Sequence, residues 1–214
     1  MTRVKICGVT SVEDALASVA AGADSVGVNF VSTVRRVDAD MARAIVRAVG
    51  GKTLVVGVVA GMSVPAMRAL KEATGMACLQ LHGDETPDDV AALLPHAYKA
   101  VRVETAADVA RARAMPGEYV LVDAKVEGLL GGTGHAFDWS LVVDLARDRK
   151  LVLAGGLHPG NVARAIATVR PWCVDVASGV ESAPRKKDPA RMAAFVAAAR
   201  ESRAAEGAAR EDAT

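Results

Sequence analysis

Eight short apolar segments recur along the chain, and a segment with helical spacing follows each of them. The apolar segments carry Val, Ile and Leu at consecutive positions, which is typical of strands buried on both faces of a parallel sheet. Their first residues are 20 to 32 positions apart, a length that fits one strand plus one helix. We predict strands at Val4–Cys7, Ser25–Phe30, Thr53–Val59, Ala77–Leu81, Ala97–Val103, Tyr119–Asp123, Leu151–Ala154 and Cys173–Ala177.

The segments between these strands are rich in Ala and carry helix start signals. Ser11 and Thr105 each stand three residues before an Asp, and Ser63 stands two residues before a Pro. We predict helices at Val12–Ala21, Ala39–Val49, Val64–Thr74, Asp88–Leu94, Thr105–Ala114, Asp138–Arg147, Asn161–Val169 and about Pro189–Arg203.

Eight strand–helix units in 214 residues favour an α/β fold of the closed (βα)8 type, the TIM barrel. An open doubly wound sheet is the alternative, but no GxGxxG motif follows the first strand to support a dinucleotide-binding version. No linker rich in Pro, Ser or Gly divides the chain. We therefore predict one barrel domain over residues 1–203 and a frayed polar tail over residues 204–214.

The charge balance and the cysteines limit the partners of this barrel. Lys and Arg number 26 against 25 acidic residues, and aromatic residues make up 3%, which argues against a nucleic-acid partner. No apolar run is long enough to span a membrane, and the first residues do not resemble a signal peptide. Cys7, Cys78 and Cys173 are scattered, which argues against a disulfide framework or zinc site and favours the cytoplasm.

The carboxyl end of the first strand carries Cys7 as a candidate base, because barrel chemistry collects at this end of the strands. The alternative is a buried Cys that only packs as a small hydrophobic residue. Side chains alternate along a strand, so Val4 and Ile6 should face the helices, while Lys5 and Cys7 point into the barrel. A buried Lys needs a partner, and strand eight lies beside strand one in a closed barrel. We therefore expect Asp175 to pair with Lys5.

Two more polar side chains end strands on the inward side. Asp123 ends the sixth strand, and the same alternation places it inside with Leu121; a helix cap or a loop anchor is the alternative role. Strands one and six are not neighbours, so Cys7 and Asp123 should face each other across the mouth as a base and an acid. His82 ends the fourth strand with Gln80 on the same inward side, although a histidine that donates to a loop carbonyl is the alternative.

Glycine-rich loops follow the last two strands. Gly155 and Gly156 follow strand seven, and Ser178 and Gly179 follow strand eight. Glycines let backbone N–H groups approach an anion, and barrels often bind phosphate with these two loops. We predict a phosphate site here, with tight structural turns as the alternative.

The longest interval between strands follows the sixth strand. It holds Gly131, Gly132, Thr133 and Gly134, which we interpret as a lid over the barrel mouth. The alternative is a surface loop without a role at the site.

Together these segments resemble the N-(5′-phosphoribosyl)anthranilate isomerase family of tryptophan biosynthesis. The resemblance runs in family order from Val4 to about Val196. Its matching segments are Val4–Gly8, Gly22–Asp24, Gln80–Gly83, Gly131–Gly134, Phe137–Trp139, Leu153–Leu157, Asn161–Val162, Val174–Val176 and Ser178–Ser182.

The resemblance implies a barrel isomerase that needs neither cofactor nor metal and acts as a monomer or homodimer. Its reaction is the Amadori rearrangement of a ribosyl phosphate on anthranilate to the 1-deoxyribulose form. By resemblance Cys7 is the general base, Asp123 is the general acid and Arg36 holds the anthranilate carboxylate. Lys5, His82 and Asp175 join Arg36 among the substrate-binding residues, and the loops around Gly156 and Ser178–Gly179 take the phosphate.

The chemistry sets conditions on the acid and the base. Asp123 must carry a proton when substrate binds, because the sugar ring opens only when its oxygen is protonated. A thiol with a pKa of ~8.5 is a weak base at neutral pH, so we expect Cys7 to be shifted toward the thiolate. Lys5 is the nearest candidate cation, but its field is largely cancelled if Asp175 holds it.

The chain departs from the family pattern where the aromatic ring should bind. The expected Ser-Pro-Arg loop has no Pro, and the adjacent Arg35 and Arg36 both remain candidates for the carboxylate anchor. Asn29 stands where an apolar residue is expected. A histidine-pathway-like or dual-substrate isomerase is one alternative, but that family generally has Asp in place of Cys7. A non-catalytic phosphosugar-binding barrel is another, and it would need neither Cys7 nor Asp123.

Overall fold

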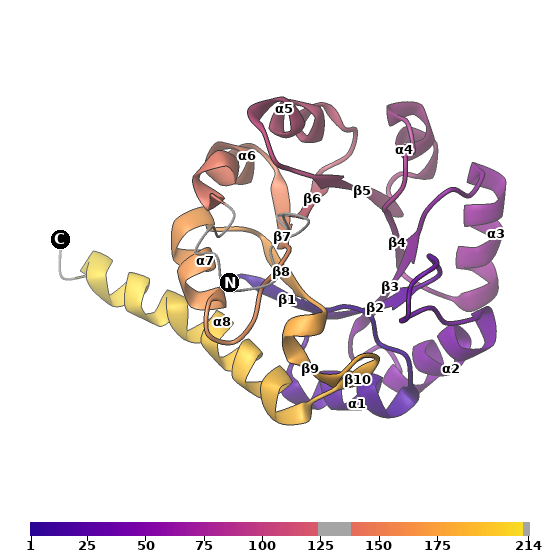
Figure 1. Cartoon of the computed structure of the whole chain (residues 1–214), viewed down its shortest axis with the longest axis horizontal. Helices are drawn as coiled ribbons and strands as arrows, with labels where there is room; N and C mark the ends of the chain where they lie inside the picture. Colours follow the sequence, from indigo (N-terminus) through magenta and orange to yellow (C-terminus); the bar gives the residue numbers. More distant parts are fainter. Residues whose placement is uncertain (124–137, 212–214) are drawn as a thin grey trace.

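The computed structural model describes residues 1–123 and 138–211 of the chain. Within these residues, eight parallel strands close into a barrel in sequence order, and β8 pairs with β1 (Figure 1). This confirms the predicted TIM barrel. The strands are β1 (Arg3–Ile6), β2 (Ser25–Asn29), β3 (Leu54–Val59), β4 (Cys78–Leu81), β5 (Ala97–Arg102), β6 (Tyr119–Asp123), β7 (Lys150–Ala154) and β8 (Cys173–Val176).

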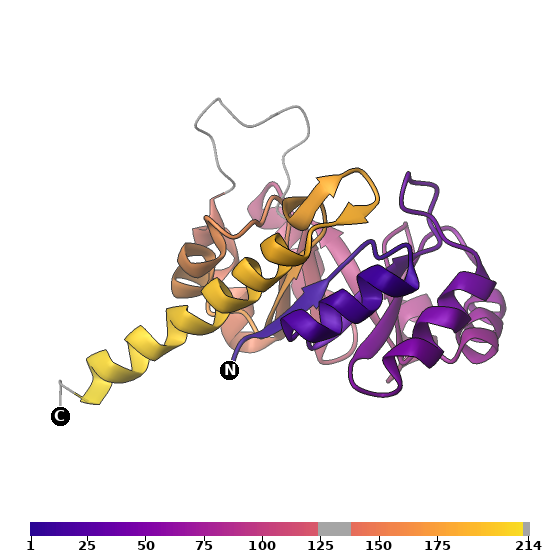
Figure 2. The same ribbon diagram turned by 90° about the horizontal axis from the view of Figure 1, so that it is seen from below.

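Helices surround the barrel on its outer side (Figure 1). They are α1 (Val12–Ala21), α2 (Ala39–Val49), α3 (Val64–Thr74), α4 (Pro87–Leu93), α5 (Ala106–Ala114), α6 (Val143–Asp148), α7 (Val162–Val169) and α8 (Pro189–Glu211), with a short 3-10 helix η1 (Trp139–Val142) before α6. After β8 the chain forms a second 3-10 turn, η2 (Ser178–Val180), and a hairpin of β9 (Glu181–Ala183) and β10 (Lys186–Lys187), which Figure 2 shows at one rim of the barrel. None of the described helices meets the length and hydropathy needed to cross a membrane.

The predicted helix starts are confirmed by their caps. The Ser11 hydroxyl accepts a hydrogen bond from the N–H of Asp14 at 3.1 Å, and Ser63 caps α3 in the same way. At α5 the N–H of Thr105 donates to the carboxylate of Asp108 at 3.0 Å. These bonds satisfy N–H groups that the first turn of a helix leaves without a partner, so each helix begins next to its capping residue.

Three helices, α4, α5 and α7, differ from the prediction by a single residue at one or both ends, and two others differ by more. The helix expected over Asp138–Arg147 divides into η1 and α6. The last helix continues to Glu211, beyond the predicted end near Arg203, because the added residues are mostly Ala, Arg and Glu, which are strong helix formers. Residues 204–211 of the expected frayed tail are therefore helical, and residues 212–214 lie outside the described part of the chain.

Side chains of the strands alternate between two cores, as the sequence pattern predicts. Val4, Ile6, Val120 and Val122 are fully buried in the outer core, between the sheet and the helices. Leu121 points the other way, into a separate inner core. The other buried members of this inner core are Val56, Tyr98, Ala100, Val152 and Cys173.

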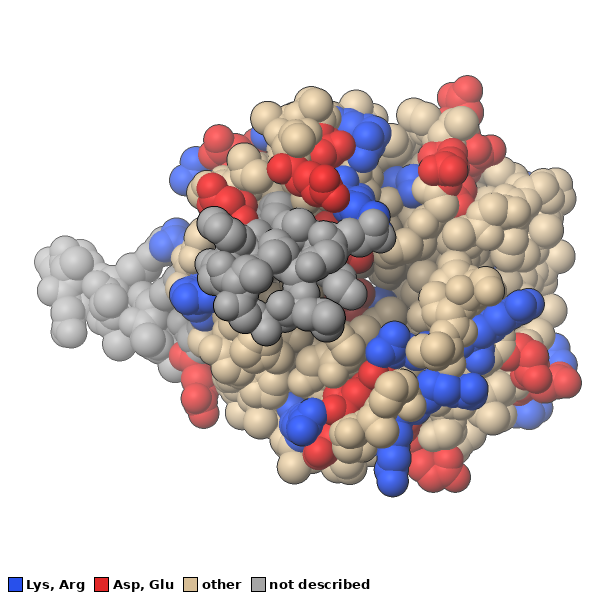
Figure 3. Space-filling view, viewed as in Figure 1, with Lys and Arg blue, Asp and Glu red and all other residues tan. Residues whose placement is uncertain are grey.

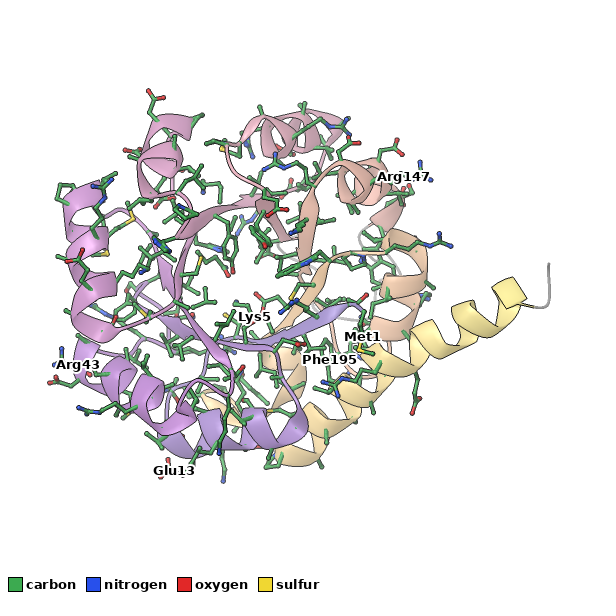
Figure 4. All side chains as sticks on the ribbon, turned by 180° about the vertical axis from the view of Figure 1, so that it is seen from behind. Met1, Lys5, Glu13, Arg43, Arg147 and Phe195 are labelled. Atoms are coloured by element: carbon green, nitrogen blue, oxygen red, sulfur yellow. The ribbon has the colours of Figure 1, made fainter. Side chains whose placement is uncertain are left out.

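A buried ion pair joins the first and last strands inside the barrel. Lys5 and Asp175 face each other in the β1–β8 register, and Lys5 Nζ lies 2.7 Å from Asp175 Oδ2 (Figure 4 labels Lys5). This confirms the predicted partner. Burial by itself would lower the pKa of Lys5, but Asp175 and Cys7 outweigh that effect and hold this pKa well above its usual value. Lys5 is therefore a permanent cation in the barrel interior.

We expect Lys5→Met to lower the free energy of unfolding by about 3–5 kcal/mol, because it leaves the buried carboxylate of Asp175 without its cation. Adding Asp175→Asn to this variant should recover part of the loss, since a buried amide costs less than a buried charge. Urea unfolding followed by circular dichroism measures both. The matched control is Lys52→Met at an exposed lysine, which should stay within about 0.5 kcal/mol of wild type. Equal stability of Lys5→Met and Lys52→Met would contradict the assigned role of the pair.

Candidate active site

Cys7 lies directly after β1, and its side chain points into the barrel mouth. Its backbone N–H donates to the carbonyl of Val176 at 2.7 Å, which extends the β1–β8 pairing by one residue. Gly27 of β2 lies beside it, and a Cβ at that position would come within 2.7 Å of Cys7 Sγ and 3.0 Å of Lys5 Nζ. A glycine on β2 therefore gives the thiol and the ammonium group the space that they occupy.

The thiol of Cys7 has a polar neighbour on the second strand. Cys7 Sγ lies 3.8 Å from Asn29 Oδ1, a distance at which a thiol donates a weak hydrogen bond. Asn29 is the residue that departs from the apolar type expected in this strand. The departure thus places a hydrogen-bond acceptor directly at the candidate base.

The expectation that Cys7 is shifted toward the thiolate is wrong for this arrangement. Burial and the charge of Asp175 raise the pKa of the Cys7 thiol, whereas Lys5 and Lys187 lower it. The effect of burial is the largest, so the pKa is raised overall. The reason is the one that the sequence left open: the Lys5 ammonium is bound to Asp175, whose negative charge opposes its effect on the sulfur.

Asp123 ends β6, which is separated from β1 by β7 and β8 in the closed sheet. The side chain is partly exposed, and it follows the inward-facing Leu121 at an interval of two residues. Its carboxylate is one of the charges that act on the ring of His82. Asp123 ends β6 and His82 directly follows β4, so both lie at the carboxyl end of the barrel, within range of each other's charge.

A chain of hydrogen bonds runs from Lys5 to His82 through the barrel interior. Gln80 Oε1 accepts from Lys5 Nζ and from the Tyr98 hydroxyl, both at 3.0 Å. Gln80 Nε2 lies 3.4 Å from His82 Nδ1, so the inward alternation predicted for Gln80 and His82 is confirmed. Partial desolvation lowers the pKa of His82, Asp123 opposes that effect, and Lys99 adds to it.

A buried lysine fixes the loop that follows His82. Lys99 Nζ of β5 donates to the carbonyls of Leu81 at 3.1 Å and Gly83 at 2.7 Å, and lies 3.3 Å from Glu85 Oε2. The carboxylate of Glu85 also accepts from the N–H of Gly83 at 2.9 Å. This cluster is not among the predicted site residues, although the Lys within the apolar run of the fifth strand indicates a buried cation, which needs a partner.

The two adjacent arginines after β2 have different environments. Arg35 binds Glu181 of β9 through Nε at 2.7 Å and Nη2 at 2.6 Å, and its stem packs over Gly8. Lys187 of β10 is fully buried and lies 3.2 Å from the same carboxylate. Burial by itself would raise the pKa of Glu181, but Arg35 and Lys187 hold it below its usual value. This cluster, which we call the Arg35–Glu181–Lys187 cluster, ties the β2–α2 loop to the hairpin after β8.

Arg36 is exposed and makes no ion pair with a carboxylate of the described residues. It lines a cavity of about 880 Å³, together with Phe30 and Met62 among others. Figure 3 shows this face of the molecule, where basic and acidic side chains surround a hollow. Of the two candidate arginines, Arg36 is thus the one whose guanidinium is available to a bound carboxylate.

The predicted anion-binding loops are in contact with each other. Gly155 and Gly156 both have positive φ values (94° and 64°), which the left-handed conformation of this turn requires. A Cβ on Gly179 would come within 2.0 Å of the carbonyl oxygen of Leu157, so the loops after β7 and β8 pack tightly together. Ser178 begins η2 between them. The four predicted residues therefore share one corner of the barrel mouth.

The predicted lid residues Gly131, Gly132, Thr133 and Gly134 lie outside the described residues. Across residues 1–123 and 138–211, no group of three or more His, Cys, Asp or Glu side chains is arranged to hold a metal ion.

The fold and site define a TIM-barrel protein whose candidate acid, base and anion-binding loops meet at the carboxyl ends of its strands. The sequence profile of the N-(5′-phosphoribosyl)anthranilate (PRA) isomerase family matches residues 4–198. The chain belongs to this family, as the resemblance implied.

Individual relatives agree with this assignment. The chain is 48% identical to the PRA isomerase of Pseudomonas aeruginosa (strain LESB58) over 94% of this chain and 96% of that one. The crystal structure of the enzyme from Thermotoga maritima is 39% identical with a TM-score of 0.86, over 94% of this chain and all of that one. A PRA isomerase in complex with reduced 1-(o-carboxyphenylamino)-1-deoxyribulose 5-phosphate is 36% identical with a TM-score of 0.84, over the same shares.

The raised pKa of Cys7 predicts slow alkylation by iodoacetamide at neutral pH, because the thiolate is the reactive form. The alkylation rate of the Cys7 peptide, measured by mass spectrometry across a pH series, should have its midpoint above the ~8.5 of a free thiol. Lys187→Met should move the midpoint further up, since it removes a cation that lowers this pKa. The matched control is Lys186→Met at the exposed neighbouring lysine, which should leave the midpoint unchanged. A wild-type midpoint below that of a free thiol would refute the assigned direction.

Proposed function

We propose that this chain catalyses the Amadori rearrangement of N-(5′-phosphoribosyl)anthranilate to 1-(2-carboxyphenylamino)-1-deoxyribulose 5-phosphate in tryptophan biosynthesis. The observation that carries the proposal is the family match over residues 4–198, joined to a thiol and a carboxyl at one barrel mouth. The reaction takes place in the cytoplasm on a small phosphorylated substrate, without nucleic acid, membrane or cofactor, in a monomer or homodimer.

Asp123 starts the reaction as the general acid. It gives its proton to the ring oxygen of the ribose, and the C1′–O bond breaks as the anilino nitrogen forms a Schiff base. The ring oxygen becomes the C4′ hydroxyl. The partly exposed carboxyl at the end of β6 can exchange its proton with solvent and still reach a substrate in the mouth.

Cys7 completes the reaction as the general base. Its thiolate removes the proton from C2′, the electron pair moves toward the Schiff-base nitrogen, and an enolamine forms. This enolamine tautomerises to the ketone and returns both residues to their starting state. Because burial raises the pKa of Cys7, the thiolate depends on the cations Lys5 and Lys187, which stabilise it.

Arg36 recognises the carboxylate of anthranilate. Its planar guanidinium suits a two-point hydrogen bond to a carboxylate. Phe30 and Met62 line the same cavity and offer apolar surface to the aromatic ring. The phosphate binds at the carboxyl ends of β7 and β8, where backbone N–H groups of Gly155, Gly156 and the Ser178–Gly179 turn approach it.

Arg36→Ala should raise KM about tenfold or more, because it removes a charge-assisted hydrogen-bond donor from the carboxylate. Arg36→Lys should restore only part of the loss, since a Lys cannot make the two-point contact. The stability of the Arg36 variants should stay within about 0.5 kcal/mol of wild type, because the side chain is exposed.

Arg35→Ala is the matched control in the neighbouring residue. It should lower the free energy of unfolding by about 1–3 kcal/mol, because it removes two hydrogen bonds from the buried Glu181, and it should raise KM less than Arg36→Ala does. Steady-state kinetics and urea unfolding measure the two effects. A larger KM effect at Arg35 than at Arg36 would assign the anchor to Arg35.

The proposed function is tested by PRA turnover, followed as the loss of anthranilate-type fluorescence. Cys7→Ser and Asp123→Asn should each lower kcat by two orders of magnitude or more, with little change in KM, which is the scale of one positioned acid or base. Binding of a product analogue without turnover in the wild type would instead identify a phosphosugar-binding barrel. Turnover of the imidazole-carboxamide substrate beside PRA would identify the dual-substrate isomerase.

A further inference from the structure

Gln80 of β4 is 3% exposed and lies between three polar side chains. Its carbonyl oxygen Oε1 is 3.0 Å from Lys5 Nζ and 3.0 Å from the Tyr98 hydroxyl, and its amide nitrogen Nε2 is 3.4 Å from His82 Nδ1. No step of the proposed reaction uses this residue. Its position links the buried ion pair to a histidine at the mouth.

Lys5 fixes the orientation of the side-chain amide of Gln80. An ammonium group only donates hydrogen bonds, so the atom of Gln80 opposite Lys5 Nζ must be the carbonyl oxygen. Asp175 holds the same ammonium from the other side at 2.7 Å, so Lys5 keeps its place and its charge. The amide nitrogen of Gln80 therefore faces His82, and an amide nitrogen also only donates.

The direction of this donor fixes the ring of His82. A neutral imidazole carries one N–H and one acceptor nitrogen. Because Gln80 Nε2–H points at Nδ1, the acceptor is Nδ1, and the proton resides on Nε2. A charged ring would place an N–H of Nδ1 against the N–H of the amide, which disfavours the charged form. Partial desolvation lowers the pKa of His82 and so also favours the neutral ring.

We propose that Gln80 is a positioning residue that keeps His82 in the Nε2–H tautomer, so that the ring presents a hydrogen-bond donor to an oxygen of the substrate's sugar. This deepens the proposed function and depends on it for the identity of the substrate. A donor at this place has a chemical advantage over an acceptor. The Asp123 carboxylate acts on this ring, so an acceptor nitrogen here would compete for the proton that the acid must give to the ring oxygen, whereas an N–H does not.

The experiment is nitrogen NMR of protein labelled with ¹⁵N in its histidine rings, at a pH above the titration of imidazole and without substrate. We expect a pyridine-type resonance for Nδ1 of His82 and a pyrrole-type resonance for Nε2, assigned with His82→Asn. His158 is an internal reference, because the backbone N–H of Gly160 donates to its Nδ1 at 3.1 Å and fixes the same tautomer. A pyrrole-type Nδ1 at His82 overturns the proposal.

Variants then test the cause. Gln80→Glu places an acceptor oxygen opposite Nδ1, so the proton should move to Nδ1 and kcat/KM should fall about tenfold, the effect of one lost hydrogen bond. Tyr98→Phe removes the other donor to Gln80 but leaves Lys5, so the wild-type tautomer should persist. If Gln80→Glu does not fold, Gln80→Met should give a mixture of both tautomers. An unchanged tautomer in the folded Gln80 variant, or a changed one in Tyr98→Phe, overturns the proposal.

This experiment separates the proposal from the proposed function, because the NMR readout needs no substrate. An Nε2–H tautomer in a wild-type protein that does not turn over PRA supports the positioning by Gln80 and refutes the isomerase assignment. Normal PRA turnover by a protein whose His82 carries its proton on Nδ1 supports the isomerase assignment and refutes the positioning by Gln80.

Discussion

The buried ion pair between Lys5 and Asp175 is the interaction on which the rest of the site depends. A barrel interior of this width is normally filled by apolar side chains, and two opposite charges are stable there only as a pair. The pair lies across the β1–β8 seam, in the register that closes the sheet. The same ammonium group also binds Gln80, so one cation on β1 orients groups on two other strands, β4 and β8.

The charge around Cys7 follows from this pair. Asp175 opposes the effect of Lys5 on the thiol, and burial then raises the pKa of Cys7. Lys187 is the second cation that acts on the sulfur, and it is itself held at Glu181 and at the carbonyl of Ala177. A thiol that is mainly protonated is less open to alkylation and oxidation, because both reactions use the thiolate. The arrangement therefore favours a protected thiol over a permanently reactive one.

The sequence was sufficient for the fold and for the direction of the inward side chains, because both follow from local periodicity. A period of two along each strand placed Lys5, Gln80, Leu121 and Asp175 inside the barrel, and closure then brought Lys5 to Asp175. Contacts between loops could not be predicted from the period of the strands. Arg35 and Glu181 are 146 positions apart, and no repeating pattern shows that a loop after β2 will cover Gly8. The direction in which the pKa of Cys7 shifts could not be predicted from the sequence either, because it depends on several opposing charges at distances that only the structure gives.

The contacts of Arg35 show how the loop after β2, which has no proline, is held in place. A proline restricts a loop by its own backbone, independently of the rest of the molecule. Here Arg35 occupies the loop instead, and its two hydrogen bonds to Glu181 fix the loop through the hairpin after β8. The carboxylate is buried and the guanidinium is only partly exposed, so solvent screens this pair less than it screens surface ion pairs. Because the hairpin directly follows the predicted phosphate loop, the position of Arg36 is coupled to the elements that should hold the other end of the substrate. An ion pair that joins these loops can therefore set the distance between the proposed carboxylate anchor and the proposed phosphate site.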